Sequence, residues 1–233
     1  MKKNVLGGQS GGPTAVINAS LYGVVTESLK HDEEIDTVYG MVNGIEGFLA
    51  DHYLDLSHTL GSRELELLKL TPAAYLGSCR FKLPEDLNSE VYRTLFRKFE
   101  ALNIGYFFYI GGNDSMDTVS KLSRYAAAVK SGIRVIGVPK TIDNDLIMTD
   151  HTPGFGSAAK YAASMVREIA LDASVYQQKS VTIIELMGRH AGWVTAASAL
   201  ARRHAGDNPL LIYMPEVPFS IERFFDDVQK ALD

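Results

Sequence analysis

The sequence contains a single cysteine, Cys79, among its 233 residues. A disulfide within the chain needs two cysteines and a cysteine-rich metal site needs more, so both are excluded. Long apolar runs are also missing, because no uninterrupted stretch approaches the roughly 20 residues that span a bilayer. The first residues are basic, but no long apolar stretch follows them, which is unlike a signal peptide. These absences predict a reduced, cytoplasmic protein.

A strong charge of either sign is missing as well. The chain has 23 Lys and Arg residues against 28 Asp and Glu residues, a net charge of −5. This mildly acidic balance argues against a broad basic face for nucleic acid, but it leaves room for a local phosphate pocket. Hydrophobic residues make up 46% and charged residues 22%, which is ordinary for a globular protein and excludes a disordered chain. We expect neither a nucleic-acid nor a membrane partner.

Short apolar runs alternate with longer helical patterns. The run Tyr-Phe-Phe-Tyr-Ile at 106–110 lacks polar alternation, as expected of a strand covered on both faces. Repeated strand and helix predict an α/β fold with a Rossmann-like, mainly parallel sheet and helices on both faces. The expected strands are 5–6, 37–39, 106–110, 134–138, 181–186 and 210–214. One expected helix begins at Pro13, and five further helices are expected over 89–101, 116–130, 156–172, 192–203 and 221–232.

A glycine-rich loop, Ser10-Gly11-Gly12-Pro13-Thr14, follows the first expected strand. Its small residues let the backbone approach a ligand closely, and the helix that follows offers free N–H groups to an anion. The loop lacks the spacing of a Walker A loop and of a G-x-G-x-x-G fingerprint. A plain tight turn is the competing interpretation.

A second polar loop, Gly111-Gly112-Asn113-Asp114-Ser115, follows the aromatic strand. Its oxygen-bearing side chains suit Mg²⁺ or its bound waters, and they suit the capping of a helix equally well.

Two more polar segments follow expected strands. In Pro139-Lys140-Thr141-Ile142-Asp143-Asn144-Asp145, an extended chain would point both Asp side chains to one side, where one can touch a metal while the other acts as a base. Lys140 offers a positive charge for phosphate, and the competing interpretation is a solvated polar turn. In Met187-Gly188-Arg189, the arginine can clamp a phosphate, although a surface ion pair is the alternative. Because parallel sheets bind ligands at the carboxyl ends of their strands, these loops together predict one phosphate site.

Taken together, these motifs resemble the phosphofructokinase family, in particular its pyrophosphate-dependent members. Gly77-Ser78-Cys79-Arg80-Phe81 and Pro215-Glu216-Val217 also fit the family in order and approximate spacing. The Thr-Ile-Asp-Asn-Asp and Met-Gly-Arg pair is highly specific, whereas the Gly-Gly-Asn-Asp loop alone would also resemble related NAD and lipid kinases. The resemblance covers the whole chain but only the N-terminal part of family chains. We therefore expect a fragment or one piece of a split polypeptide, without full activity by itself.

The resemblance implies a reversible glycolytic step, phosphoryl transfer to the 1-hydroxyl of fructose 6-phosphate to give fructose 1,6-bisphosphate. It implies a donor-phosphate domain over 1–155 and part of a sugar-phosphate domain over 156–233. It also implies a homodimer or homotetramer, because subunits share the sugar site. By the family pattern, Asp143 is the base and Arg189 a second catalytic residue; Gly11, Gly12, Arg80, Asp114 and Lys140 bind the donor; Thr141, Asp143, Met187, Gly188 and Arg189 bind the sugar; and Asn113 and Asp145 lie near Mg²⁺.

The identity of the donor depends on Asp114 and Lys140. ATP-using members resemble one another in having glycine at both positions, which leaves room for the nucleotide. A carboxylate at 114 would crowd and repel an α-phosphate, whereas Lys140 suits pyrophosphate, so we expect pyrophosphate as donor. An ATP-dependent enzyme and a catalytically silent sugar-phosphate-binding regulatory subunit are the alternatives.

The sequence departs from the family pattern at two positions of the site. Asn113 stands where the family has an acid, and Lys179-Ser180 replaces an arginine expected to hold the sugar 6-phosphate. A lysine supplies a point charge without the bidentate fork of arginine.

Overall fold

A computed structural model describes residues 1–233 and divides them into two compact units, 1–140 and 141–233. The division follows Lys140, whereas the sequence predicts a boundary at 155–156. No helix in either unit is long and apolar enough to cross a membrane.

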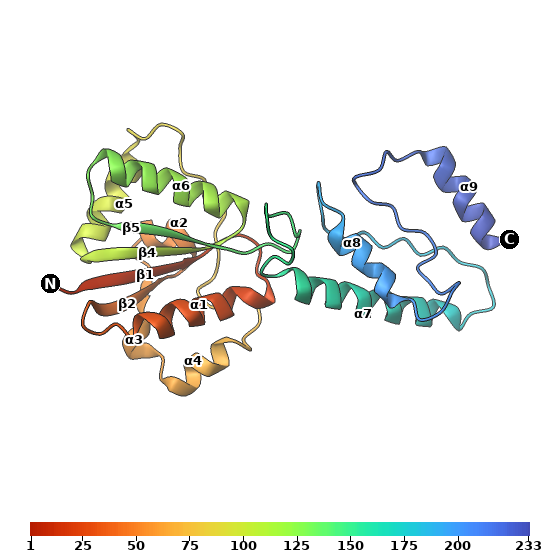
Figure 1. The fold of residues 1–233 in the computed structure, drawn as a ribbon, viewed down its shortest axis with the longest axis horizontal. Coiled ribbons are helices and arrows are strands. Elements are labelled where there is room, and N and C mark those ends of the chain that lie inside the picture. The colour runs from red at the N-terminus through yellow and green to blue at the C-terminus, as the bar shows by residue number, and fades with distance from the viewer. The chain divides into compact units, whose positions relative to one another are not determined.

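The first unit is built on a five-stranded sheet in the order β3-β2-β1-β4-β5 (Figure 1). The pairs β1–β2, β1–β4 and β4–β5 are parallel, and β3 is antiparallel to β2, so the predicted mainly parallel sheet is confirmed. The strand order reverses at β1, which makes the carboxyl ends of β1 and β4 the switch point where such sheets bind ligands. The strands are β1 (Lys3–Gln9), β2 (Ile35–Met41), β3 (Tyr53–Asp55), β4 (Ile104–Gly111) and β5 (Arg134–Pro139).

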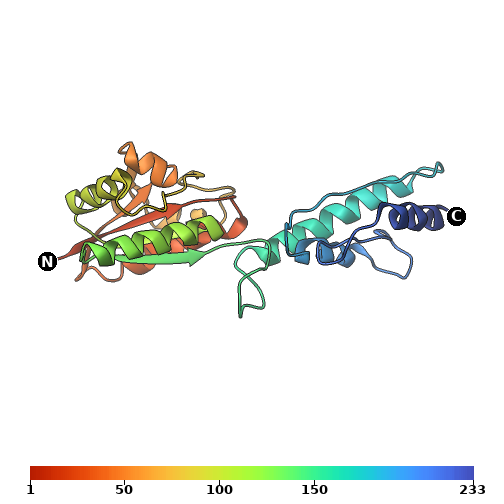
Figure 2. The ribbon, with the colours of Figure 1, turned by 90° about the horizontal axis from the view of Figure 1, so that it is seen from above.

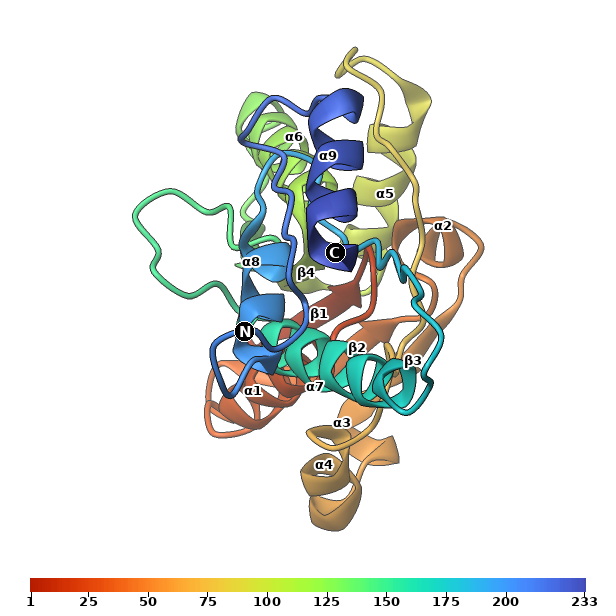
Figure 3. The ribbon, with the colours of Figure 1, turned by 90° about the vertical axis from the view of Figure 1, so that its right-hand side faces the viewer.

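Helices cover both faces of this sheet, as predicted (Figures 1 and 3). Seen from above, α6 runs alongside the strands (Figure 2). The short elements between 44 and 68 are absent from the sequence-based expectation. One face carries α1 (Ala15–Ser28), α3 (Leu56–Thr59) and α4 (Ser62–Leu68), and the other carries α2 (Gly44–Leu49), α5 (Glu90–Ala101) and α6 (Asn113–Ala128).

The central strand β4 shows why its sequence has no polar alternation. Successive side chains of a strand point to opposite faces. Phe107 and Tyr109 enter the core beneath α2, α5 and α6, while Ile110 enters the core beneath α1, α3 and α4. Both faces of β4 are therefore buried, which confirms the expected covered strand.

The second unit contains helices and irregular segments. The helices match those expected near 156–172, 192–203 and 221–232, but the strands predicted at 181–186 and 210–214 are wrong. The one β-bridge of this unit joins Thr141 to Gly154. Its helices are α7 (Phe155–Ser174), α8 (Trp193–Ala197), the 3₁₀ helix η1 (Ser198–Ala201) and α9 (Ile221–Leu232).

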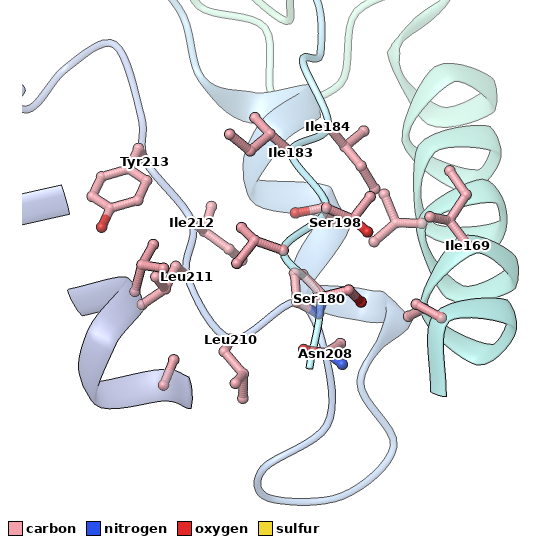
Figure 4. Close-up of a pocket in the computed structure, with 18 of the residues that line it drawn as sticks. Ile169, Ser180, Ile183, Ile184, Ser198, Asn208, Leu210, Leu211, Ile212 and Tyr213 are labelled. Atoms are coloured by element: carbon pink, nitrogen blue, oxygen red, sulfur yellow. The ribbon is translucent and has the colours of Figure 1, made fainter. Parts of the chain in front are cut away.

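The two segments predicted as strands lie on opposite walls of an apolar cleft (Figure 4). The cleft has a volume of about 760 Å³, and α9 contributes Phe224 and Val228 to its lining. Ile183 is 75% exposed and α9 buries none of its residues. Apolar β-branched runs favour a strand, but a strand also needs a neighbour for its backbone hydrogen bonds, and neither segment has one in this unit.

Candidate functional site

Two glycine-rich loops meet at the carboxyl ends of β1 and β4 in the first unit. The first glycine loop (residues 10–14) continues the sheet pairing through Ser10 N–H, which donates to Ile110 O at 2.9 Å. The second glycine loop (residues 111–115) packs tightly against it: a Cβ on Gly111 would lie 2.8 Å from Ser10 O and 2.0 Å from Ser115 Oγ. Only glycine fits at 111, and the sheet edge places both predicted loops side by side.

A third segment, the arginine segment (residues 77–85), closes over the first glycine loop. Ser78 Oγ donates to Gly11 O at 2.6 Å, and Ser10 Oγ donates to Cys79 O at 3.3 Å. Arg80 follows directly and is exposed. The structure therefore brings Arg80 and Gly11, both predicted to contact the donor, into neighbouring loops.

A buried network of side-chain amides holds the start of the arginine segment in place. The Gln9 side chain donates to Asn18 Oδ1 at 2.9 Å and accepts from Leu76 N–H at 2.9 Å. The Asn18 side chain donates to Thr71 O and Ala73 O, both at 2.8 Å. Because buried polar groups are costly unless paired, this network holds the entry to the arginine segment against β1 and α1. Gln9 and Asn18 were not singled out from sequence, since their partners are remote along the chain.

Lys140 joins the two glycine loops. Its side chain is 5% exposed, and its Nζ donates to Gly12 O at 2.6 Å. Its backbone N–H donates to Gly111 O at 2.9 Å. A partly desolvated ammonium at two glycine-rich loops is a strong anion-binding feature, because the low local dielectric strengthens its attraction for a phosphate.

The residues Asn113 and Asp114 lie in the first turn of α6, which begins before the predicted start at 116. Both side chains are exposed. Asp114 forms an ion pair of 3.6 Å with Lys82, a residue that sequence reasoning missed although it follows Arg80 by two positions. The pair places a second cation of the arginine segment beside the second glycine loop.

In the second unit, Thr141 joins the two acids of its loop. Its hydroxyl accepts from Asp143 N–H and donates to Asp145 Oδ1, both at 3.1 Å. Asn144 between them has a φ of 56°, so the segment turns and is not extended as the sequence argument assumed. The turn, rather than the alternation of a strand, brings the Asp143 backbone N–H and the Asp145 carboxylate to one threonine hydroxyl.

The same loop is closed by buried backbone contacts. The Asn144 side chain accepts from Thr152 N–H at 2.8 Å, and Thr152 Oγ1 donates to Thr141 O at 2.9 Å. Gly154 has a φ of 114°, and a Cβ there would lie 3.0 Å from Thr141 O. These contacts hold Asp143 in a fixed loop, which a positioned base requires.

The segment Met187–Arg189 forms a separate turn of the second unit. Met187 and Arg189 are exposed, and Gly188 has a φ of 143°, which favours glycine. Glu216 accepts from Gly192 N–H at 2.7 Å and so supports the turn.

Comparison with known proteins shows the family to which the chain belongs. The family model of phosphofructokinase matches residues 4–233. The chain belongs to this family. A pyrophosphate–fructose 6-phosphate 1-phosphotransferase of Rhodospirillum rubrum is 45% identical over 232 residues, which cover 100% of this chain and 55% of that protein.

Two solved structures extend the likeness to the fold. Pyrophosphate-dependent phosphofructokinase from Marinobacter aquaeolei is 44% identical with a TM-score of 0.88, and that from Nitrosospira multiformis is 42% identical with a TM-score of 0.90. Each is matched over 98% of this chain and 57% of its own. The chain thus spans little more than half the length of these relatives.

Proposed function

We propose that this phosphofructokinase chain transfers a phosphoryl group from pyrophosphate to the 1-hydroxyl of fructose 6-phosphate, giving fructose 1,6-bisphosphate reversibly. The observation that carries the proposal is the buried Lys140 ammonium bound to Gly12 O, with Asp114 at the start of α6. The relatives at 42–45% identity are named for the same reaction.

The donor site consists of Gly11, Gly12, Arg80, Asp114 and Lys140. Lys140 supplies positive charge to a pyrophosphate oxygen, and the glycines let the backbone approach it. A carboxylate at 114 repels the α-phosphate and crowds the ribose of a nucleotide, but pyrophosphate has neither group. Discrimination against ATP therefore rests on a repulsive residue together with an attractive one.

The acceptor chemistry falls to the loop of Thr141. Asp143 accepts the proton of the sugar 1-hydroxyl as that oxygen attacks phosphorus, and Thr141 orients the loop. Arg189 stabilises charge that develops on the transferred group, and Met187 and Gly188 line the sugar site. Transfer of this kind depends on positioning and charge neutralisation more than on covalent chemistry.

Mg²⁺ is part of the proposal. The structure gathers no group of three or more His, Cys, Asp or Glu ligands. Mg²⁺ is usually held by one or two carboxylates together with substrate phosphates and water. Asp145 would supply the carboxylate and Asn113 would bind through water, while the ion neutralises charge on the donor oxygens.

Residues 1–155 would form the donor-phosphate domain and 156–233 part of the sugar-phosphate domain. A homodimer or homotetramer in the cytoplasm would complete the sugar site, with Lys179 as a substitute for the expected arginine.

The test compares pyrophosphate with ATP as donor in a coupled assay for fructose 1,6-bisphosphate, using the longest polypeptide that the reading frame encodes. We expect turnover with pyrophosphate and at most trace turnover with ATP. Turnover with ATP and none with pyrophosphate would refute the proposal. Binding of fructose 6-phosphate without turnover on either donor would favour a silent regulatory subunit.

A further inference from the structure

Lys121 is a buried cation in the first unit that the proposed chemistry does not use. Its side chain is 6% exposed, although it lies on α6 near the surface. Its Nζ forms ion pairs with Glu85 at 2.6 Å and Asp117 at 2.7 Å, and it donates to Leu83 O at 3.2 Å. All three donor directions of the ammonium are therefore occupied.

These contacts hold the charge of Lys121 in place. Hydrogen bonds that its ammonium donates to the Asp117 and Glu85 carboxylates raise the pKa of Lys121, so it stays protonated at any physiological pH. Asp117 belongs to the same helix, whereas Leu83 and Glu85 belong to the arginine segment. Lys121 therefore connects α6 to the arginine segment, which has no regular secondary structure of its own.

The contacts of Lys121 lie at one end of the arginine segment. At the other end, Ser78 Oγ donates to Gly11 O at 2.6 Å. Arg80 and Lys82 lie between these two anchors, and Lys82 forms an ion pair with Asp114 in the first turn of α6. Lys121 follows Asp114 by about two helical turns on the same helix. One rigid helix therefore carries both the acid beside the donor and the anchor of the two cations.

We propose that Lys121 is a positioning residue that holds the arginine segment so that Arg80 and Lys82 face the donor phosphates. The proposal rests on the assignment of the donor site given above. A flexible segment would have to order its two long side chains at each binding event, which costs conformational entropy, whereas the anchored segment has already lost it.

The test uses Lys121→Met, which keeps the aliphatic stem and removes all three contacts, and Lys121→Arg, which keeps the charge. Lys98→Met is the matched control. Lys98 lies on α5, another helix of the first unit, and it also pairs with a carboxylate, that of Asp51. Glu85→Gln is a milder second variant at an exposed carboxylate, in case Lys121→Met does not fold. Each protein is examined by calorimetric titration with inorganic pyrophosphate and by amide hydrogen exchange.

We expect Lys121→Met to weaken pyrophosphate binding about tenfold, because the side chains of Arg80 and Lys82 would then have to be ordered at each binding event. Amides of 77–85 should exchange faster while those of β1 and β4 stay protected, and affinity for fructose 6-phosphate should be unchanged. Glu85→Gln should act in the same direction and less strongly, and Lys121→Arg should restore most of the affinity.

Three results would overturn the proposal. Unchanged exchange at 77–85 would show that Lys121 does not hold the segment, and faster exchange with unchanged pyrophosphate affinity would show that the anchor is unrelated to the donor. Uniformly faster exchange would show a merely structural role. If the wild-type chain binds no pyrophosphate, the proposed function is refuted, and so is the proposed role of Lys121 in donor binding. The rates of amide hydrogen exchange at 77–85 would still show whether Lys121 holds the arginine segment.

Discussion

The two units differ in how far their side chains are buried. The sheet of the first unit has a hydrophobic core on each face, and its largest aromatics, Phe107, Tyr92 and Tyr109, are at most 1% exposed. In the second unit, α9 buries no residue, and Phe225 is 62% exposed.

This difference shows how each half of the proposed reaction would be supported. The donor loops extend from paired strands and are tied by Lys140, so their geometry is a consequence of the core beneath them. The loop of Asp143 is instead fixed by hydrogen bonds within the loop, which Thr141 Oγ1 and Asn144 Oδ1 accept. We therefore expect substitutions in the first unit to change stability and donor binding, and those in the second unit to change turnover.

The largest expected effect is on turnover, from Asp143→Asn. The amide cannot accept the sugar proton, so the rate should fall by about 10²–10⁴-fold, the usual contribution of a positioned base. Pyrophosphate affinity should be unchanged, because the donor residues belong to the first unit. Steady-state assays of the complete enzyme with Asp150→Asn as control, an exposed acid of the same loop, check this; equal losses in the two variants would contradict it.

The contrast in burial predicts different costs for the same truncation in the two units. Phe107→Ala should lower the free energy of unfolding by about 3–5 kcal/mol, because it removes a fully buried ring. Phe225→Ala should change it by no more than about 0.5 kcal/mol, as expected at an exposed site. Urea denaturation followed by tyrosine fluorescence measures both values, and similar costs would remove the contrast between the units.

Removal of the buried ammonium should affect the donor alone. Lys140→Met should weaken pyrophosphate binding by about 10–100-fold, the range expected when a hydrogen bond to a charged group is lost. Affinity for fructose 6-phosphate should stay within twofold, a margin of about 0.4 kcal/mol. Titration calorimetry on this variant and on Lys160→Met, a change at an exposed lysine of α7, provides the measurement, and a parallel loss for both ligands would argue for general disruption.

The smallest effect concerns the fit of the glycine loops. Gly111→Ala should destabilise the first unit by about 1–3 kcal/mol, because its Cβ overlaps Ser115 and Ser10. Gly12→Ala places its Cβ in open space and serves as the control for stability. The midpoints of thermal unfolding should differ between the two variants by a few degrees. Equal midpoints would mean that the loops accommodate the added Cβ without a loss of stability.

Much of the first unit could be predicted from sequence because its signals are local. The aromatic run 106–110 lacks polar alternation and forms a strand covered on both faces. The motifs at 10–14 and 111–115 follow strands, and topology alone brings them together. The helix α2 escaped prediction because it is short and contains glycines, and its first residue follows Asn43 at a φ of 58°.

The features that were not predicted depend on contacts with other residues, which a local sequence pattern cannot identify. The run 181–186 has the composition of a strand but finds no neighbour for its backbone in this unit. Lys121 resembles any lysine of an exposed helix until the segment at 83–85 folds over it. The Thr141 hydroxyl contacts the Asp143 backbone N–H and the Asp145 carboxylate in a turn where Asn144 adopts a left-handed conformation.

We propose that Lys140 and Asp114 make the first unit a site for pyrophosphate and not for a nucleotide. Calorimetric titration of one protein sample with pyrophosphate and with ATP, each with Mg²⁺, tests it most directly through the ratio of the two affinities. The account predicts at least about tenfold tighter binding of pyrophosphate, a difference of about 1.4 kcal/mol. Equal affinity, or tighter binding of ATP, would contradict it.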